Sequence, residues 1–187
     1  MILKTFISED RISGKIQELS RKIEDYIGDE EVILIANLKG SFLFFADLIR
    51  KIRSSHIMVD FISTVSYNNT ESTGIIKITR DVSIELKGKK IIIIEDILDT
   101  GLTLDHLIRY IKDIHQPSDI KTCVLLDKPS RRKVQVGVDY VGFIIEDYFV
   151  VGYGLDYNEM YRNLPYIAIL DMECSEIKKT DELDYRI

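Results

Sequence analysis

The sequence is poor in cysteine and lacks any apolar segment long enough to cross a membrane. Its two cysteines, Cys123 and Cys174, lie far apart, and neither cysteine nor histidine occurs with metal-ligand spacing, which argues against a zinc site. A transmembrane helix needs roughly 20 apolar residues, and no stretch of this chain approaches that length. The start of the chain shows no charged-then-apolar signal segment. We therefore expect a cytoplasmic protein with reduced thiols.

A surplus of positive charge is also absent. The 187 residues carry a net charge of −6, so we expect no broad attraction to nucleic acids or to anionic lipids. With 45% hydrophobic and 30% charged residues, the chain suits one compact domain over residues 1–187, in which residues 171–187 form a polar tail. No internal repeat and no low-complexity linker divides it.

Apolar patterns of helical and extended periodicity alternate along the chain. Residues 8–27 have apolar side chains at helical spacing, with Ser8 or Ser13 as the cap. A buried strand is predicted at Glu31–Asn37 and a helix at Phe42–Lys51, which together make half of a βαβ unit. The predicted fold class is therefore α/β, a mostly parallel twisted sheet flanked by helices. Further strands are expected at Met58–Tyr67, Ile75–Arg80, Ile120–Leu126, Tyr140–Ile145 and Tyr166–Leu170.

The most informative stretch is Ile91–Leu104, with the sequence IIIIEDILDTGLTL. Four consecutive isoleucines indicate a strand that is buried on both faces. Acids, hydroxyl side chains and a glycine follow where this strand would end, and the next helix is predicted over Leu104–Lys112. Open α/β sheets bind their ligands at this carboxyl edge.

The residues after the isoleucines combine a phosphate site with excess negative charge. Asp99–Thr103 would lie at the start of a helix, where free amides and the helix dipole favour a phosphate. The carboxylates of Glu95, Asp96 and Asp99 would repel that phosphate unless they face a sugar diol or a divalent cation. The stretch therefore indicates a sugar phosphate. For a single acid the commoner interpretation is a solvated helix cap, which does not account for the whole string.

Two other phosphate motifs are excluded. A Walker P-loop has lysine where this chain has Leu102, and a dinucleotide fingerprint needs three glycines where Gly152–Tyr157 has two. The ends of three predicted strands supply backbone amides, acids with hydroxyls, and cations respectively. We expect these ends to meet at one edge of the sheet, and they are Leu38–Ser41, Glu95–Thr103 and Lys128–Arg132.

Ile91–Thr103 resembles the phosphoribosyl diphosphate (PRPP) signature of type I phosphoribosyltransferases. Over nearly the whole chain except its C-terminal end, other segments are similar to the bacterial type of the hypoxanthine-guanine phosphoribosyltransferase family. These segments are Leu38–Ser41, Phe44–Leu48, Val65–Tyr67, Ser72–Gly74, Lys128–Arg132, Tyr140–Phe143 and Phe149–Tyr166. The resemblance implies the type I phosphoribosyltransferase fold, with a small hood built from the N- and C-terminal parts of the chain.

The resemblance assigns the central stretch to the phosphoribosyl donor. It implies that Glu95 and Asp96 hold the ribose hydroxyls, directly or through magnesium. Asp99 would be the catalytic base that accepts the proton leaving the imidazole ring of the purine. The residues that would bind the 5-phosphate are Thr100, Gly101, Leu102 and Thr103.

Loops on either side would hold the diphosphate. The resemblance implies that Lys39 and Gly40 present backbone amides to it, with a cis peptide bond between Leu38 and Lys39. Arg162 would bind the diphosphate, and Asp156 would coordinate a magnesium ion that bridges to it.

A third group of residues would bind the purine. Lys128 would donate to the exocyclic oxygen, Phe149 would stack on the ring, the Val150 backbone would contact the ring edge, and Leu155 would also contact substrate. Taken singly, Phe149 and Val150 suit a core strand, and Lys128 suits a solvated basic turn. We prefer the functional interpretation because these residues occur together.

The resemblance also implies a flap that closes over the site. The chain departs from the family pattern at two places. The flap would carry Ser66 and Tyr67, followed by a polar loop at 68–74. Asn68-Asn69 stands where the family commonly has Tyr-Gly, and Ile145-Glu146-Asp147 stands where Ile-Pro-Asp is common.

The implied activity is the transfer of 5-phosphoribosyl from PRPP to a 6-oxopurine. Magnesium would be the cofactor, with Glu95, Asp96 and Asp156 as its ligands, and the assembly would be a homo-oligomer, either a dimer or a tetramer. Hypoxanthine, guanine and xanthine share the 6-oxo group, so the sequence does not rank them. A PRPP-binding regulator without catalysis is the alternative, which the purine-site residues and the acidic charge disfavour.

Overall fold

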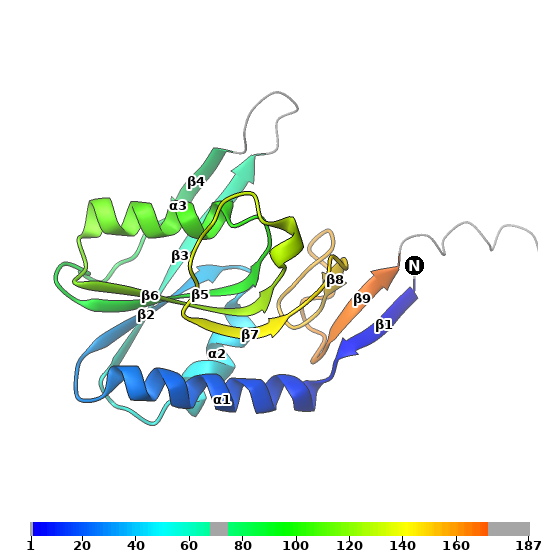
Figure 1. The fold of residues 1–187 in the computed structure, drawn as a ribbon, viewed down its shortest axis with the longest axis horizontal. Helices are drawn as coiled ribbons and strands as arrows, with labels where there is room; N and C mark the ends of the chain where they lie inside the picture. Colours follow the sequence, from blue (N-terminus) through cyan, green and yellow to red (C-terminus); the bar gives the residue numbers. More distant parts are fainter. Residues whose placement is uncertain (1, 68–74, 172–187) are drawn as a thin grey trace, which may run out of the picture.

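The computed structural model describes residues 2–67 and 75–171, which form a six-stranded sheet with helices on both faces and a smaller sheet beyond one end (Figure 1). The strand order of the large sheet is β4-β3-β2-β5-β6-β7. Five strands are parallel and β4 is antiparallel to β3, which confirms the α/β prediction. The strands are β2 (Val32–Leu38), β3 (Ile57–Tyr67), β4 (Ile75–Arg80), β5 (Lys90–Leu98), β6 (Asp119–Asp127) and β7 (Tyr140–Ile144).

Three helices cover the two faces of the large sheet. Helices α1 (Glu9–Ile27) and α2 (Phe42–Lys51) lie on one face, and α3 (Leu102–Tyr110) lies on the other (Figure 1). A π-helical turn, Ile111–His115, continues α3. The side chain of Ser8 accepts a hydrogen bond from the Arg11 amide, so Ser8 rather than Ser13 caps α1.

The isoleucine run of β5 is buried on both faces because its side chains alternate between two hydrophobic cores. Ile92 and Ile94 pack in the core that includes α1 and α2, whereas Ile91 and Ile93 pack in the core under α3. All four side chains are fully buried. Strand β5 pairs with β2 on one side and β6 on the other, so it is central to the sheet.

A three-stranded antiparallel sheet forms the hood, in the order β1 (Ile2–Ile7), β9 (Ile167–Asp171) and β8 (Val150–Val151). The residue patterns predicted β9 as a strand but not β1, and they indicated β8 only in that Val150, taken singly, suits a core strand. Most of β1 is exposed and β8 has only two residues, so neither shows the alternation of buried and exposed side chains that predicts a strand. The expected polar loop at 68–74 and most of the expected tail lie outside the described residues. No helix in the described part of the chain is long and apolar enough to cross a membrane.

Candidate active site

Two adjoining pockets open at the carboxyl edge of the large sheet, and Asp96 and Asp99 line both. We name the pockets after the roles that the resemblance implies: the first, the donor pocket, has a volume of about 320 Å³, and the second, the acceptor pocket, has a volume of about 460 Å³. The donor pocket is further lined by Asn37, Leu38, Gly40, Thr64, Glu95, Thr100, Gly101 and Thr103. The acceptor pocket is further lined by Lys128, Arg131, Asp147, Phe149, Val150, Leu155 and Asp156. The three strand ends therefore meet as expected.

The turn between β5 and α3 forms one wall of the donor pocket. Gly101 has φ 85°, and a Cβ atom added there would lie 2.8 Å from the Val134 carbonyl oxygen, so only glycine suits the position. Helix α3 begins at Leu102, earlier than the expected Leu104, because the Gly101 carbonyl already accepts from the Asp105 amide at 3.0 Å. The first amides of α3 are therefore available at the turn.

Two largely buried carboxyl groups lie beside this turn. Glu95 accepts a hydrogen bond from Asn37 Nδ2 at 3.0 Å, and the same amide also contacts Thr64. Burial, followed by the neighbouring Asp96 carboxylate, raises the pKa of Glu95 well above its usual range. Burial also raises the pKa of Asp96 to about 6. Both groups therefore favour a ligand that either donates hydrogen bonds or carries positive charge.

The carboxylate oxygens of Glu95 and Asp96 suit magnesium, which prefers oxygen ligands. Among residues 2–67 and 75–171, no group of three His, Cys, Asp or Glu side chains converges as a preformed metal site. Magnesium is commonly held by one or two carboxylates together with substrate phosphates and water. Glu95 and Asp96 therefore suit an ion that shares its coordination with a phosphorylated substrate.

The loop after β2 leaves no space for a Cβ atom at Gly40, which lies in the loop, or at Gly154, which follows β8 and packs on it. The Leu38–Lys39 peptide bond is cis, as the resemblance implied. A Cβ atom at Gly40 would lie 1.7 Å from Asp96 Oδ2, and one at Gly154 would lie 2.0 Å from the Gly40 carbonyl oxygen. Gly154 therefore allows the segment after β8 to pack closely on this loop, which gives this glycine a packing role.

Charged side chains meet above the same loop. Arg162 forms an ion pair with Asp156 at 2.7 Å and donates to the Gly154 carbonyl at 2.7 Å. Glu159, which the sequence analysis did not single out, bridges Arg162 at 3.2 Å and Lys39 at 3.0 Å. These two cations lower the pKa of Glu159. Lys39, whose backbone amide was expected at the diphosphate, and Arg162 are thus linked through a shared acid.

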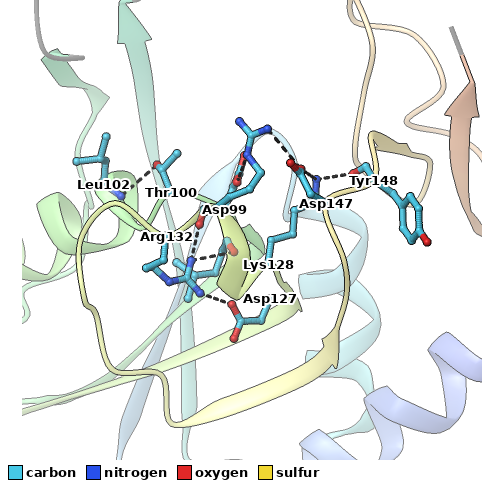
Figure 2. A network of polar contacts seen from close by, with 10 residues as sticks. Asp99, Thr100, Leu102, Asp127, Lys128, Arg132, Asp147 and Tyr148 are labelled. Atoms are coloured by element: carbon cyan, nitrogen blue, oxygen red, sulfur yellow. Dashed lines mark hydrogen bonds and ion pairs between the residues drawn. The ribbon is translucent and has the colours of Figure 1, made fainter. Parts of the chain in front are cut away.

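The acceptor pocket combines an aromatic face with a buried ammonium group. The Lys128 side chain is 8% exposed, donates to the Tyr148 carbonyl oxygen and lies 3.9 Å from Asp147 (Figure 2). Burial lowers the pKa of Lys128. Phe149 is 44% exposed and contacts Tyr157 edge to face, so a face of its ring is available for stacking. Val150 and Leu155 are buried beside it.

Two arginines after Lys128 contact Asp99, one at its side chain and one at its main chain. The sequence placed both in the cationic strand end Lys128–Arg132 but assigned neither an individual role. Arg132 donates to the carbonyl oxygens of Leu98 and Asp99 and pairs with the Asp127 carboxylate (Figure 2). Arg131 lies with its Nε atom 2.8 Å from Asp99 Oδ1. The basic run Lys128–Lys133 is equally typical of a solvated turn, and the resemblance of Lys128–Arg132 to the family did not single out either arginine.

Ser66 and Tyr67 form the end of β3, where they pair with Ile76 and Ile75 of β4. The rest of the expected flap, 68–74, is outside the described part of the chain. The sequence analysis also missed Asn37 and Thr64, and the signal for Asn37 was a polar residue at the end of an apolar strand.

The chain matches the model of the phosphoribosyl transferase domain over residues 7–158. It is 45% identical to the hypoxanthine-guanine phosphoribosyltransferase of Bacillus subtilis, with 90% of this chain and 93% of that protein covered. It is 42% identical to the bifunctional protein TilS/HprT of Listeria monocytogenes, with 92% of this chain but only 26% of that protein covered. A crystal structure of a hypoxanthine-guanine phosphoribosyltransferase from Bacillus anthracis is similar with a TM-score of 0.85 and 49% identity, covering 91% of this chain and all of that one. The chain therefore belongs to the phosphoribosyl transferase domain family.

Proposed function

We propose that this protein transfers the 5-phosphoribosyl group of PRPP to hypoxanthine, guanine or both, releasing diphosphate and forming IMP or GMP. The observation that carries the proposal is the pair of adjoining pockets, one beside a helix-start phosphate site and the other beside an exposed aromatic ring and a buried lysine. Relatives that match this chain over nearly their whole length are named for this activity.

The donor binds in the first pocket. The amides and hydroxyls of Thr100–Thr103 receive the 5-phosphate, and the carboxyl groups of Glu95 and Asp96 face the ribose hydroxyls. Because both carboxyl groups are largely buried, water does not fully solvate them. The ribose hydroxyls would then supply hydrogen bonds that the carboxyl groups lack. The turn and the two acids thus account for both ends of a ribose phosphate.

The diphosphate binds at the loop after β2. The amides of Lys39 and Gly40 face it, and the Arg162 guanidinium binds its oxygens. Arg162 is already paired with Asp156 and Glu159. Binding therefore requires Arg162 to exchange an internal carboxylate for a diphosphate oxygen.

The acceptor binds in the second pocket. Phe149 stacks on the purine, Lys128 donates to the 6-oxo group, and the Val150 backbone and Leu155 line the ring edge. As the ribose–diphosphate bond breaks, the ribose carbon gains oxocarbenium character and bonds to the purine nitrogen. Asp99 accepts the proton that leaves the imidazole ring.

Magnesium would be held by Glu95, Asp96 and Asp156 together with the substrate, and when bound it neutralises charge on the departing diphosphate. We further propose that Ser66 and Tyr67 belong to a segment that closes over the site and excludes water. The protein would act in the cytoplasm as a single-domain subunit of a dimer or tetramer.

The first test incubates the protein with PRPP, magnesium and each of hypoxanthine, guanine, xanthine and adenine. Nucleotide product is expected with hypoxanthine or guanine and not with adenine, which lacks the 6-oxo group. Absence of product with every base would instead support a PRPP-binding regulator.

The second test is Asp99→Asn, which keeps the shape of the side chain but cannot accept the proton. We expect kcat to fall by about 100-fold or more, because general-base catalysis contributes that much. PRPP binding in the presence of magnesium, measured by calorimetry, should persist. Unchanged turnover would refute the role of Asp99.

A further inference from the structure

Arg131 contacts the carboxylate of Asp99 directly, although it is not among the residues that the resemblance assigns to the reaction. The chain turns sharply after β6, and a short 3-10 helix, Pro129–Arg131, directs the arginine back toward β5. Its Nε atom lies 2.8 Å from Asp99 Oδ1, and its Nη1 atom lies 3.4 Å from Asp147 Oδ1. Arg131 therefore joins the end of β5 to the loop that carries Phe149.

The contact gives the two carboxylate oxygens of Asp99 different surroundings. Oδ1 is enclosed, and no group in the described part of the chain gives it a well-aligned hydrogen bond. The Asp99 side chain as a whole is nevertheless 37% exposed, and it lines both pockets. Since Oδ1 contributes almost none of that exposure, the open part of the carboxylate includes Oδ2. Arg131 thus covers one oxygen and leaves the other on the open side of the carboxylate, which borders both pockets.

The other charges near Asp99 do not do the same. Lys128 donates to the Tyr148 carbonyl, and Arg132 contacts the main-chain carbonyl of Asp99 rather than its side chain. Asp96, Asp147 and Asp156 add negative charge to the same pocket. Among residues 2–67 and 75–171, Arg131 is the cation that forms an ion pair with the Asp99 carboxylate.

We propose that Arg131 is a positioning residue for Asp99: by holding Oδ1 it fixes the carboxylate so that Oδ2 faces the imidazole ring of the bound purine. The inference rests on the proposed role of Asp99 as the proton acceptor. Proton transfer needs the acceptor oxygen within hydrogen-bond reach of the proton, and a misplacement of about 1 Å can cost about 100-fold in rate. An unpinned Asp99 would sample other rotamers among three neighbouring acids.

A double-mutant cycle tests this inference. Arg131→Ala should lower kcat by about 10- to 100-fold, while KM for PRPP stays within about twofold because the donor pocket does not include Arg131. In the Asp99→Asn background, the same substitution should change kcat by less than about twofold, because the group that it positions is already inactive. Equal losses in both backgrounds would overturn the inference and indicate a direct contact between Arg131 and the purine.

Chemical rescue provides a readout that loss of folding would not give. Added guanidinium ion should restore part of the kcat of Arg131→Ala but not of Asp99→Asn. The matched control is Arg109→Ala, which removes an arginine whose exposed ion pair with Asp105 lies on α3, and its kcat should equal that of the unmodified protein. If Arg131→Ala retains full kcat while Asp99→Asn does not, the positioning role fails and the proposed function stands. If Asp99→Asn is fully active, Asp99 is not the proton acceptor, and the inference fails with that role although the transferase activity itself is present.

Discussion

At the scale of single residues, the site depends on carboxyl groups placed where water does not fully solvate them. Glu95 is 5% exposed and shares an edge of the donor pocket with Asp96. Burial disfavours both charged forms, the Asp96 carboxylate further raises the pKa of Glu95, and the Asp156 carboxylate further raises that of Asp96. Keeping these acids ionised therefore costs the ligand-free protein stability.

That cost predicts how stability depends on pH. The pKa of Asp96 is raised from 3.8 to about 6, so between these values the folded state binds more protons than the unfolded state. The free energy of unfolding therefore falls as pH rises through this window. Asp96→Asn should remove the penalty and stabilise the magnesium-free protein by about 1–2 kcal/mol at pH 7.5, with a smaller gain at pH 4.5.

Urea unfolding of both proteins at the two pH values measures this difference. A gain of equal size at pH 4.5 and 7.5 would mean that packing, rather than ionisation, separates Asp96 from asparagine.

At the scale of elements, one side chain joins the ends of two neighbouring strands. Arg132 contacts two carbonyl oxygens at the end of β5 and the Asp127 carboxylate at the end of β6 (Figure 2). The amide of Lys133 then donates to the Thr100 carbonyl at 2.9 Å. The turn that would bind phosphate is therefore supported from behind by the loop that follows Lys128.

We expect Arg132→Leu to destabilise the fold by about 2–4 kcal/mol, because it leaves the Asp127 side chain, 15% exposed, without its cation. Arg109→Leu breaks a pair in which the arginine is 74% exposed and should cost no more than about 0.5 kcal/mol. Thermal and urea unfolding of the two variants provide the comparison. Similar losses would show that Arg132 does not hold the strand ends together.

Helices and strands were predicted correctly from the sequence where the apolar residues follow a clear periodic pattern. The apolar positions of 8–27 gave α1 almost to the residue because this helix buries one face against a core. The isoleucine run gave the centre of β5, which continues beyond the expected end at Glu95 to Leu98. Strand β1 was missed because it is held by pairing with β9 while most of its side chains remain exposed. Arg131 and Glu159 were missed for a different reason. Their partners lie far along the chain or across a tight turn, and neither spacing nor residue type encodes those contacts.

At the scale of the whole molecule, the hood and the large sheet share one hydrophobic core. Ile7 at the end of β1, Val150 of β8 and Ile167 of β9 pack in the same cluster as Leu34 and Ile92 of the large sheet. The hood therefore has no separate core comparable to that of the main sheet, although Val151 and Ala168 form a small cluster of their own.

This shared core predicts a single cooperative unfolding transition. Ile167→Ala, which truncates a fully buried hood residue, should destabilise the protein by about 2–4 kcal/mol. The whole transition should shift to lower temperature without splitting. Calorimetry and far-ultraviolet circular dichroism, recorded on the same samples, measure this. An early transition confined to the hood would show two independent units.

The two pockets share one wall, and this determines which segments can change the preference for one acceptor base over another. Asp96 and Asp99 come from one strand end, so a change there alters the handling of donor and acceptor together. Lys128, Phe149 and Val150 come from other segments and line the acceptor pocket alone. Replacing those segments could exchange one nucleobase for another while the ribose phosphate continues to bind unchanged. In this architecture the donor pocket can stay the same while the segments of the acceptor pocket are replaced.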